Sequence, residues 1–166
     1  MSERSRTYSW HDPQAIFAKW GELSGLELIQ AMLDDVLPHP PMADTLGFRA
    51  VDASAGRAVF VSESAEWLYN PIGVVHGGFA MTILDSAMGV AVHTTLAKTE
   101  RYTTLETKVN FVRPITVETG PVRCEAVVVH RGRRVATAEG RLVADRGGKL
   151  LAHGLTTCLI EDTARP

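Results

Sequence analysis

The sequence predicts an α+β fold in which an antiparallel sheet of five or six strands wraps around one long central helix, preceded by an N-terminal helical extension. Two observations predict this class. An apolar run at 79–92 has apolar residues on nearly every helix face, as expected for a helix buried on all sides. The other segments alternate apolar and polar residues, and short turns that contain glycine separate them. Short turns join neighbouring antiparallel strands, since parallel pairing needs a long crossover.

The N-terminal extension is expected to form a helical arm over residues 1–43, with the main domain at 44–166. Helices are predicted at 13–20 and 25–35, because Asp12-Pro13 is a good helix start and Ser24 can cap the second helix. The run Pro38-His39-Pro40-Pro41 ends the arm, since proline cannot continue a helical hydrogen-bond ladder.

The main domain is expected to consist of strands around the central helix. Extended segments are predicted at 46–52, 57–63, 104–112, 122–130, 134–145 and 149–160. Within 104–112, the alternation places Leu105 on the same face as Thr107, Val109 and Phe111. One sheet cannot cover every side of the central helix, so at least a homodimer is expected.

Composition and charge exclude several classes of function. A chain of 166 residues with a net charge of −2 gives no reason to expect a nucleic-acid partner. The apolar run contains Asp85, which argues against a membrane span. The first residues lack the apolar stretch of a signal peptide, and Cys124 and Cys158 lie far apart in strand-like segments, so a reduced cytoplasmic location is expected. The six histidines show no metal-ligand spacing, and no metal or other cofactor is expected.

The stretch from Asn70 to Asp85 carries the chemistry. A Pro/Gly-rich turn, Asn70-Pro71-Ile72-Gly73-Val74-Val75-His76-Gly77-Gly78, opens the central helix. Free N–H groups at a helix start carry partial positive charge and attract developing negative charge. Asp85 stands alone in the apolar helix, where a carboxylate is costly unless it is solvated, paired or used. The combination predicts a carbonyl held by amides and attacked with the help of an acid residue.

This pattern resembles the hotdog-fold acyl-CoA thioesterases, most closely the phenylacetate-degradation (PaaI-like) branch. The resemblance runs from Leu23 onward and includes Thr103-Thr104-Leu105-Glu106, the segment 109–114 and the Gly-Arg-Arg-Val-Ala hairpin at 132–136. It implies hydrolysis of an acyl- or aryl-CoA thioester. Coenzyme A would then be part of the substrate.

The resemblance implies a catalytic role for several residues of the motif. Asp85 is the expected carboxylate, either as a general base or as a nucleophile that forms a mixed anhydride. The Gly77 N–H is expected to polarise the thioester carbonyl, and Asn70 to hold the water or that carbonyl. Thr104 would orient the attacking water, with Thr103 as its competitor.

Other residues are expected to support the site or bind the substrate. His76 is expected to buttress the loop by hydrogen bonds, and Gly78 to serve the backbone fit. Apolar residues of the motif region and the arm should line the acyl pocket: Leu68, Tyr69, Phe79 and Ile83. Cationic side chains should meet the phosphates of coenzyme A, with four candidates: Arg113, Arg131, Arg133 and Arg134.

Spacing along the helix predicts that the site is shared between chains. Asp85 lies roughly 12 Å from Gly77 along the axis, at about 1.5 Å per residue. That is too far for both to act on one carbonyl within one subunit, so the amide and the carboxylate should come from opposite chains, as the resemblance also implies. The resemblance also implies that the dimer pairs again into a homotetramer.

Two other functions fit the same fold. One is hydration or dehydration of an acyl thioester, for which the usual His and acid arrangement is missing. The other is acyl-CoA binding or sensing without turnover, for which Asp85 would be unnecessary.

Overall fold

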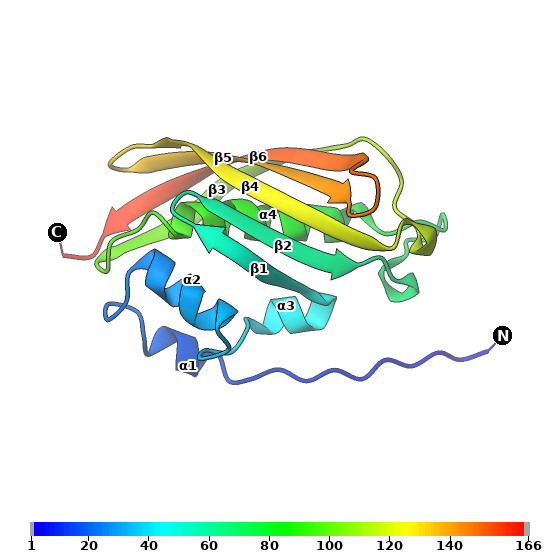
Figure 1. Cartoon of the computed structure of the whole chain (residues 1–166), viewed down its shortest axis with the longest axis horizontal. Helices are drawn as coiled ribbons and strands as arrows, with labels where there is room; N and C mark the ends of the chain where they lie inside the picture. The colour runs from blue at the N-terminus through cyan, green and yellow to red at the C-terminus, as the bar shows by residue number, and fades with distance from the viewer. Residues whose placement is uncertain (1, 165–166) are drawn as a thin grey trace.

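A computed structural model describes residues 2–164 and confirms the predicted fold class. One six-stranded antiparallel sheet, in the order β1-β2-β4-β5-β6-β3, curls around a long helix (Figure 1). The strands are β1 (Phe48–Ser54), β2 (Arg57–Glu63), β3 (Glu100–Phe111), β4 (Pro121–Arg131), β5 (Val135–Ala144) and β6 (Leu150–Asp162). Short 3₁₀ turns at Glu66–Leu68 (η1) and Val117–Thr119 (η2) lie in the connections.

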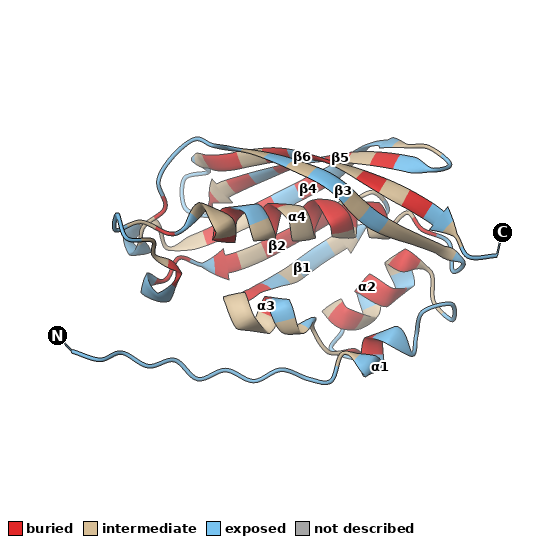
Figure 2. Cartoon of the chain, turned by 180° about the vertical axis from the view of Figure 1, so that it is seen from behind, coloured by how far each residue is buried: buried red, intermediate tan, exposed pale blue. Residues whose placement is uncertain are grey.

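The central helix α4 (Gly77–His93) lies at the centre of the hydrophobic core. Its side chains facing the sheet, among them Ile83, Leu84 and Met88, are fully buried. Figure 2 shows the buried positions of α4 against the concave side of the sheet. Met81 on another face is 42% exposed, so a single chain leaves part of this apolar helix uncovered.

The N-terminal arm contains three helices, α1 (Gln14–Phe17), α2 (Gly25–Leu33) and α3 (Pro41–Leu46). The first two are shorter than expected. The third was not predicted, because the proline run was interpreted as a terminator, whereas Pro41 occupies the first helical turn, where a missing N–H costs nothing. The helix α3 crosses the expected boundary between residues 43 and 44.

The arm is joined to the C-terminal end of α4 by a close backbone contact at Gly25. The Gly25 N–H donates to the Leu96 carbonyl at 3.0 Å. A Cβ at Gly25 would lie 1.7 Å from the carbonyl oxygen of His93, so only glycine fits here. Ser24 and Glu27 form a capping box at the start of α2, which includes the expected Ser24 cap.

Strand β3 forms one edge of the sheet and is irregular near its middle. Its pairing with β6 shifts between Thr104 and Glu106. This bulge turns Leu105 outward, where it is 59% exposed. The expectation that Leu105 shares a face with Thr107 and Val109 was therefore wrong, because the simple alternation does not hold across the bulge.

The two cysteines are free and buried. Burial raises the pKa of the Cys124 thiol to about 12 and also raises the pKa of Cys158. Within residues 2–164, no helix has both the length and the hydropathy needed to cross a bilayer.

Candidate active site

The loop before α4 is held in one shape by its own hydrogen bonds. The Asn70 N–H donates to the Val74 carbonyl at 2.8 Å, and Gly73 adopts a positive φ of 83° between them. The Asn70 Oδ1 accepts from the Ile72 N–H at 3.0 Å and from the Val74 N–H at 3.3 Å. Its Nδ2 donates to no other described residue, so this amide remains able to bind a carbonyl or a water.

At the start of α4, the Gly78 N–H is hydrogen-bonded to the capping residue, whereas the Gly77 N–H is not. The His76 Nδ1 accepts from the Gly78 N–H at 2.8 Å, which makes His76 the N-cap. The Gly77 N–H donates to no described residue. The Phe111 ring covers Gly77, since a Cβ there would lie 3.0 Å from Phe111 Cζ. The arrangement leaves one helix-terminal donor free beside an aromatic surface.

Two turns further along α4, Asp85 is partly buried and held by a hydroxyl group. The Thr107 Oγ1 donates to Asp85 Oδ1 at 2.9 Å. Thr107 Oγ1 also lies 3.1 Å from Thr156 Oγ1, which in turn donates to the Glu106 carbonyl at 2.7 Å. The two threonines therefore fix the orientation of the carboxylate.

Sequence reasoning missed Thr107. Thr103 and Thr104, the expected orienting residues, precede the bulge of β3, where Thr104 pairs with Cys158 of β6. The hydroxyl that donates to Asp85 belongs to Thr107 instead. The inward alternation of Thr107 was visible in the sequence, but its partner on α4 was not.

Asn70 and Gly77 share a cavity of about 350 Å³ with Phe111 and Arg113. Asp85 instead lines a separate cavity of about 460 Å³ between α4 and the arm. One chain therefore brings together the two expected carbonyl donors, but it does not bring the carboxylate to them.

Comparisons with known proteins show the family of this chain. Residues 72–151 match the family model of the thioesterase superfamily. A protein of Halobacterium salinarum named as an esterase is 35% identical over 117 residues, which cover 68% of this chain and 73% of that protein. The chain belongs to the thioesterase superfamily.

Two solved structures of similar proteins support the hotdog fold of this superfamily member. A conserved protein of Pseudomonas aeruginosa is 32% identical, with a TM-score of 0.68 over 74% of this chain and 95% of that one. A phenylacetic acid degradation protein PaaI of Thermus thermophilus is 29% identical, with a TM-score of 0.66 over 72% and 98%. The resemblance to hotdog thioesterases is confirmed, and the likeness to the PaaI protein is consistent with the branch that the sequence suggested.

The apolar residues expected around the substrate separate into two groups. Leu68, Tyr69 and Phe79 line a cavity of about 430 Å³ together with His76 and Gly78. Ile83 differs, because it is fully buried against the sheet in the main core. Three of the four expected residues therefore line one cavity, and Ile83 lies in the main core.

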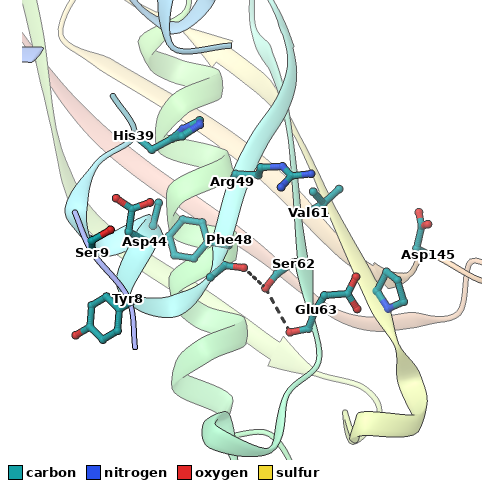
Figure 3. A pocket seen from close by; sticks show the side chains of 13 residues that line it. Tyr8, Ser9, His39, Asp44, Phe48, Arg49, Val61, Ser62, Glu63 and Asp145 are labelled. Atoms are coloured by element: carbon teal, nitrogen blue, oxygen red, sulfur yellow. Dashed lines mark hydrogen bonds between the residues drawn. The ribbon is translucent and has the colours of Figure 1, made fainter. Parts of the chain in front are cut away.

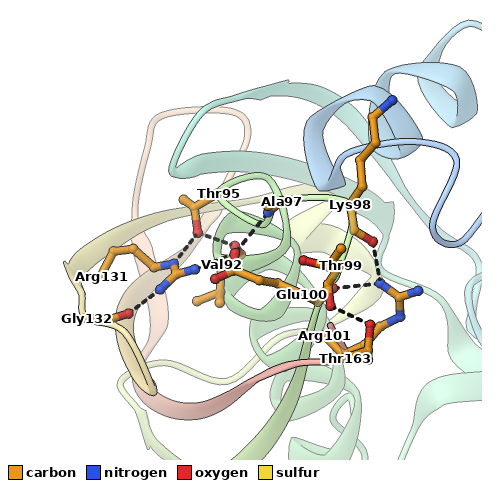
Figure 4. Close-up of polar contacts among 10 residues, drawn as sticks. All are labelled: Val92, Thr95, Ala97, Lys98, Thr99, Glu100, Arg101, Arg131, Gly132 and Thr163. Atoms are coloured by element: carbon orange, nitrogen blue, oxygen red, sulfur yellow. Dashed lines mark hydrogen bonds and ion pairs between the residues drawn. The ribbon is translucent and has the colours of Figure 1, made fainter. Parts of the chain in front are cut away.

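The arginines lie at opposite ends of α4. Arg113 is exposed and borders the Asn70 cavity, where its Nη1 donates to the Leu150 carbonyl at 2.7 Å. Arg131 lies at the other end, where its guanidinium is held within the chain. Its Nη2 lies 2.7 Å from Glu100 Oε2, and its Nε donates to Thr95 Oγ1 (Figure 4). Arg133 and Arg134 are exposed in the adjoining hairpin. Of these four arginines, Arg113 alone borders the cavity that holds the amide donors.

Two titratable side chains lie beyond Asp85 on the same cavity wall. Burial and the nearby Arg101 lower the pKa of His93 from 6.5 to about 4. Burial, Cys158 and Asp85 raise the pKa of Tyr102. The two rings lie 5.8 Å apart. Both groups are therefore neutral near pH 7, and the wall beyond Asp85 carries no further charge.

A further groove, of about 620 Å³, is lined by residues of the N-terminal segment, β1 and β2 (Figure 3). It is bordered by Tyr8 of the N-terminal segment, Arg49 and Glu63, and by none of the expected catalytic residues. Across residues 2–164, no three His, Cys, Asp or Glu side chains come close enough together to hold a metal ion.

Proposed function

We propose that this protein is an acyl-CoA thioesterase that hydrolyses an acyl- or aryl-CoA thioester to the free acid and coenzyme A. The observation that carries the proposal is Asp85, a carboxylate held by Thr107 in the wall of a mostly apolar cavity, in a chain of the thioesterase superfamily. A relative from Listeria monocytogenes, 25% identical over 72% of this chain and 95% of its own length, is named a 1,4-dihydroxy-2-naphthoyl-CoA hydrolase. That name supports an aryl- or acyl-CoA substrate.

The chemistry needs two groups acting on one thioester. The Gly77 N–H would donate to the thioester oxygen and stabilise the negative charge that develops on it. As a general base, Asp85 would take a proton from the water that attacks the carbonyl carbon, and the departing thiolate would then take up that proton. As a nucleophile, Asp85 would itself attack the carbonyl carbon, expel the thiolate and form a mixed anhydride that water hydrolyses.

The site would be completed by a second copy of the chain. Asp85 and Gly77 line different cavities and lie roughly 12 Å apart along one helix axis. A donor in an oxyanion hole must come within about 3 Å of the oxygen. We therefore propose a homodimer with two shared sites, which pairs again into a homotetramer.

Coenzyme A would be bound as part of the substrate and no other cofactor would be required. Arg113 borders the Asn70 cavity and is the residue placed to meet its phosphates. Arg133 and Arg134 could contribute only if a second chain brings them there. Two free, buried thiols suit the reduced cytoplasm, which is the proposed location.

The test is release of free thiol from a panel of acyl-CoA thioesters. The wild-type protein should release coenzyme A, and Asp85→Asn should lower kcat/KM by about a thousandfold or more. The matched control is Asp145→Asn, because Asp145 is exposed in the turn after β5 and lines neither the Asp85 cavity nor the Asn70 cavity. Its activity should equal that of the wild type.

Other outcomes would contradict the proposal. Full activity of a folded Asp85→Asn protein would remove Asp85 from the mechanism. Tight binding of acyl-CoA without thiol release would point to a binding protein. Addition of water to an enoyl-CoA without thiol release would point to a hydratase.

A further inference from the structure

The arm and the main domain line a chamber whose wall includes Asp85. Its volume is about 460 Å³, within the range of ligand pockets. One wall comes from the main domain: Asp85, Ser86, Val90, His93 and Tyr102. The opposite wall, here called the arm wall, comes from α1 and α2: Ile16, Leu28, Ile29 and Met32. Figure 2 shows α2 beside the C-terminal half of α4.

The arm wall is fixed in place at both of its ends. The contact of Gly25 with the His93 carbonyl docks α2 on the last turn of α4. The Arg101 guanidinium lies over the Trp20 ring at 4.8 Å, which ties the segment after α1 to the start of β3. The chamber is therefore a built part of this fold rather than a gap under a loose segment.

The lining of the chamber suits an apolar group that begins at a reactive carbonyl. The arm wall is entirely apolar, and its four members are less than 9% exposed. Among the α4 residues of the main-domain wall, Asp85 comes first, and His93 lies eight residues further on, roughly 12 Å along the helix axis. A thioester carbonyl attacked at Asp85 would thus have an apolar space of that length beside it.

We propose that this chamber binds the acyl group of the substrate and that the arm wall, with Val90 opposite, sets the longest acyl group accepted. The inference rests on the proposed function. The substrate class is an apolar acyl group, linear or aryl, that extends up to roughly 12 Å from the thioester carbon. The arm wall lies outside residues 72–151, the part shared with the family model, so this selectivity belongs to the arm of this chain.

The first measurement is the Kd of thioether analogues of acyl-CoA, which cannot be hydrolysed. Analogues of acetyl-, hexanoyl-, decanoyl- and palmitoyl-CoA are titrated by calorimetry against the wild type. Each methylene buried in the chamber should improve affinity about fourfold. Affinity should rise from acetyl to decanoyl and stop rising before palmitoyl. A flat series, or one that keeps rising through palmitoyl, would overturn the proposal.

The second measurement narrows the chamber from each wall. Val90→Phe and Met32→Phe should weaken binding of the decanoyl analogue by about tenfold or more and leave the acetyl analogue within twofold. The matched controls are Val129→Phe and Val36→Phe, since both residues are exposed away from the chamber. Melting temperatures establish that each variant is folded. Equal effects on both analogues, or the same effect in the controls, would contradict the assignment.

The two proposals can fail separately. If no acyl-CoA releases thiol but the affinity series behaves as expected, the proposed hydrolysis is wrong and the chamber is a binding site. If thiol is released but the series is flat, the enzyme stands and its acyl group lies elsewhere.

Discussion

Asp85 is held by a single neutral hydroxyl, and this decides how its carboxylate can work. Oδ1 accepts from Thr107 at 2.9 Å, and no ion pair to Asp85 exists among residues 2–164. A carboxylate held in this way keeps its second oxygen free, because no cation competes for it. In the proposed mechanism Thr107 would therefore position the carboxylate, and its loss should affect turnover more than binding.

For Thr107→Val we expect kcat to fall by about tenfold with KM within twofold of the wild type, because a hydrogen bond to a charged group is lost. Steady-state kinetics with one acyl-CoA measures both. The control is Thr157→Val, since Thr157 lies on the next strand and donates to Glu106 instead. Equal losses in both variants would mean that the effect is not specific to Asp85.

His93 should make the protein sensitive to acid. Burial and Arg101 lower its pKa from 6.5 to about 4, so below pH 6.5 the unfolded chain binds a proton that the folded chain does not. The free energy of unfolding should fall by about 3 kcal/mol between pH 7 and pH 4 on account of this group, and then level off.

Urea unfolding of the wild type and of His93→Gln at several pH values measures this contribution. The unfolding free energy of the wild type minus that of His93→Gln should fall by about 3 kcal/mol as the pH falls from 7 to 4. A constant difference across this range would show that His93 is protonated equally in the folded and unfolded chains.

Among single residues, the sequence could predict those whose chemistry conflicts with their surroundings. Asp85 stood out because a lone carboxylate in an apolar helix needs a reason. Thr107 did not stand out, because its contact with Asp85 depends on how an edge strand crosses α4 after a bulge. Ile83 was misplaced because a helix that is apolar on all sides does not show which face meets the sheet.

Among the elements, α4 depends on how its first turn is capped. His76 accepts from the Gly78 N–H, as an N-cap residue does. The same turn presents the unpaired Gly77 N–H, so the cap also fixes the direction of that donor.

His76→Ala should lower the free energy of unfolding by about 1 kcal/mol, and His76→Asn should recover most of the loss, because asparagine is a good N-cap. Chemical denaturation at pH 7.5 measures both variants. If asparagine is no better than alanine, the stability comes from contacts of the imidazole ring rather than from the cap.

Most of the strands and helices could be predicted from the local sequence pattern. Alternation and glycine turns predicted all six strands, with ends that differ by a few residues, and Gly56 takes the positive φ expected in the first hairpin. The helix α3 was missed because Pro41 was interpreted as a terminator, although proline serves equally well in a first turn. Which strand lies at the edge depends on long-range pairing, which the local pattern does not encode.

For the whole molecule, the separation of Asp85 from Gly77 would make the proposed hydrolysis depend on assembly. Met81 on α4 and Phe111 at the end of β3 are both large, apolar and more than 40% exposed. The exposure of these two side chains is expected if a partner chain covers this region.

Complementation tests the shared site. Asp85→Asn and Gly77→Val chains with different tags are expressed together and purified through both tags. Each homodimer should be inactive, whereas the mixed dimer has one site with neither change and should show about half of the wild-type activity per dimer. No recovery in a purified mixed dimer would mean that each chain carries a complete site.

The contact between Gly25 and the last turn of α4 has a consequence for protein engineering. A chimera that exchanges the arm between homologues must keep a glycine at this point together with the backbone it meets, because any side chain would collide with the His93 carbonyl. Libraries that aim at new acyl preferences should therefore graft residues 13–43 with the 93–96 segment as one cassette.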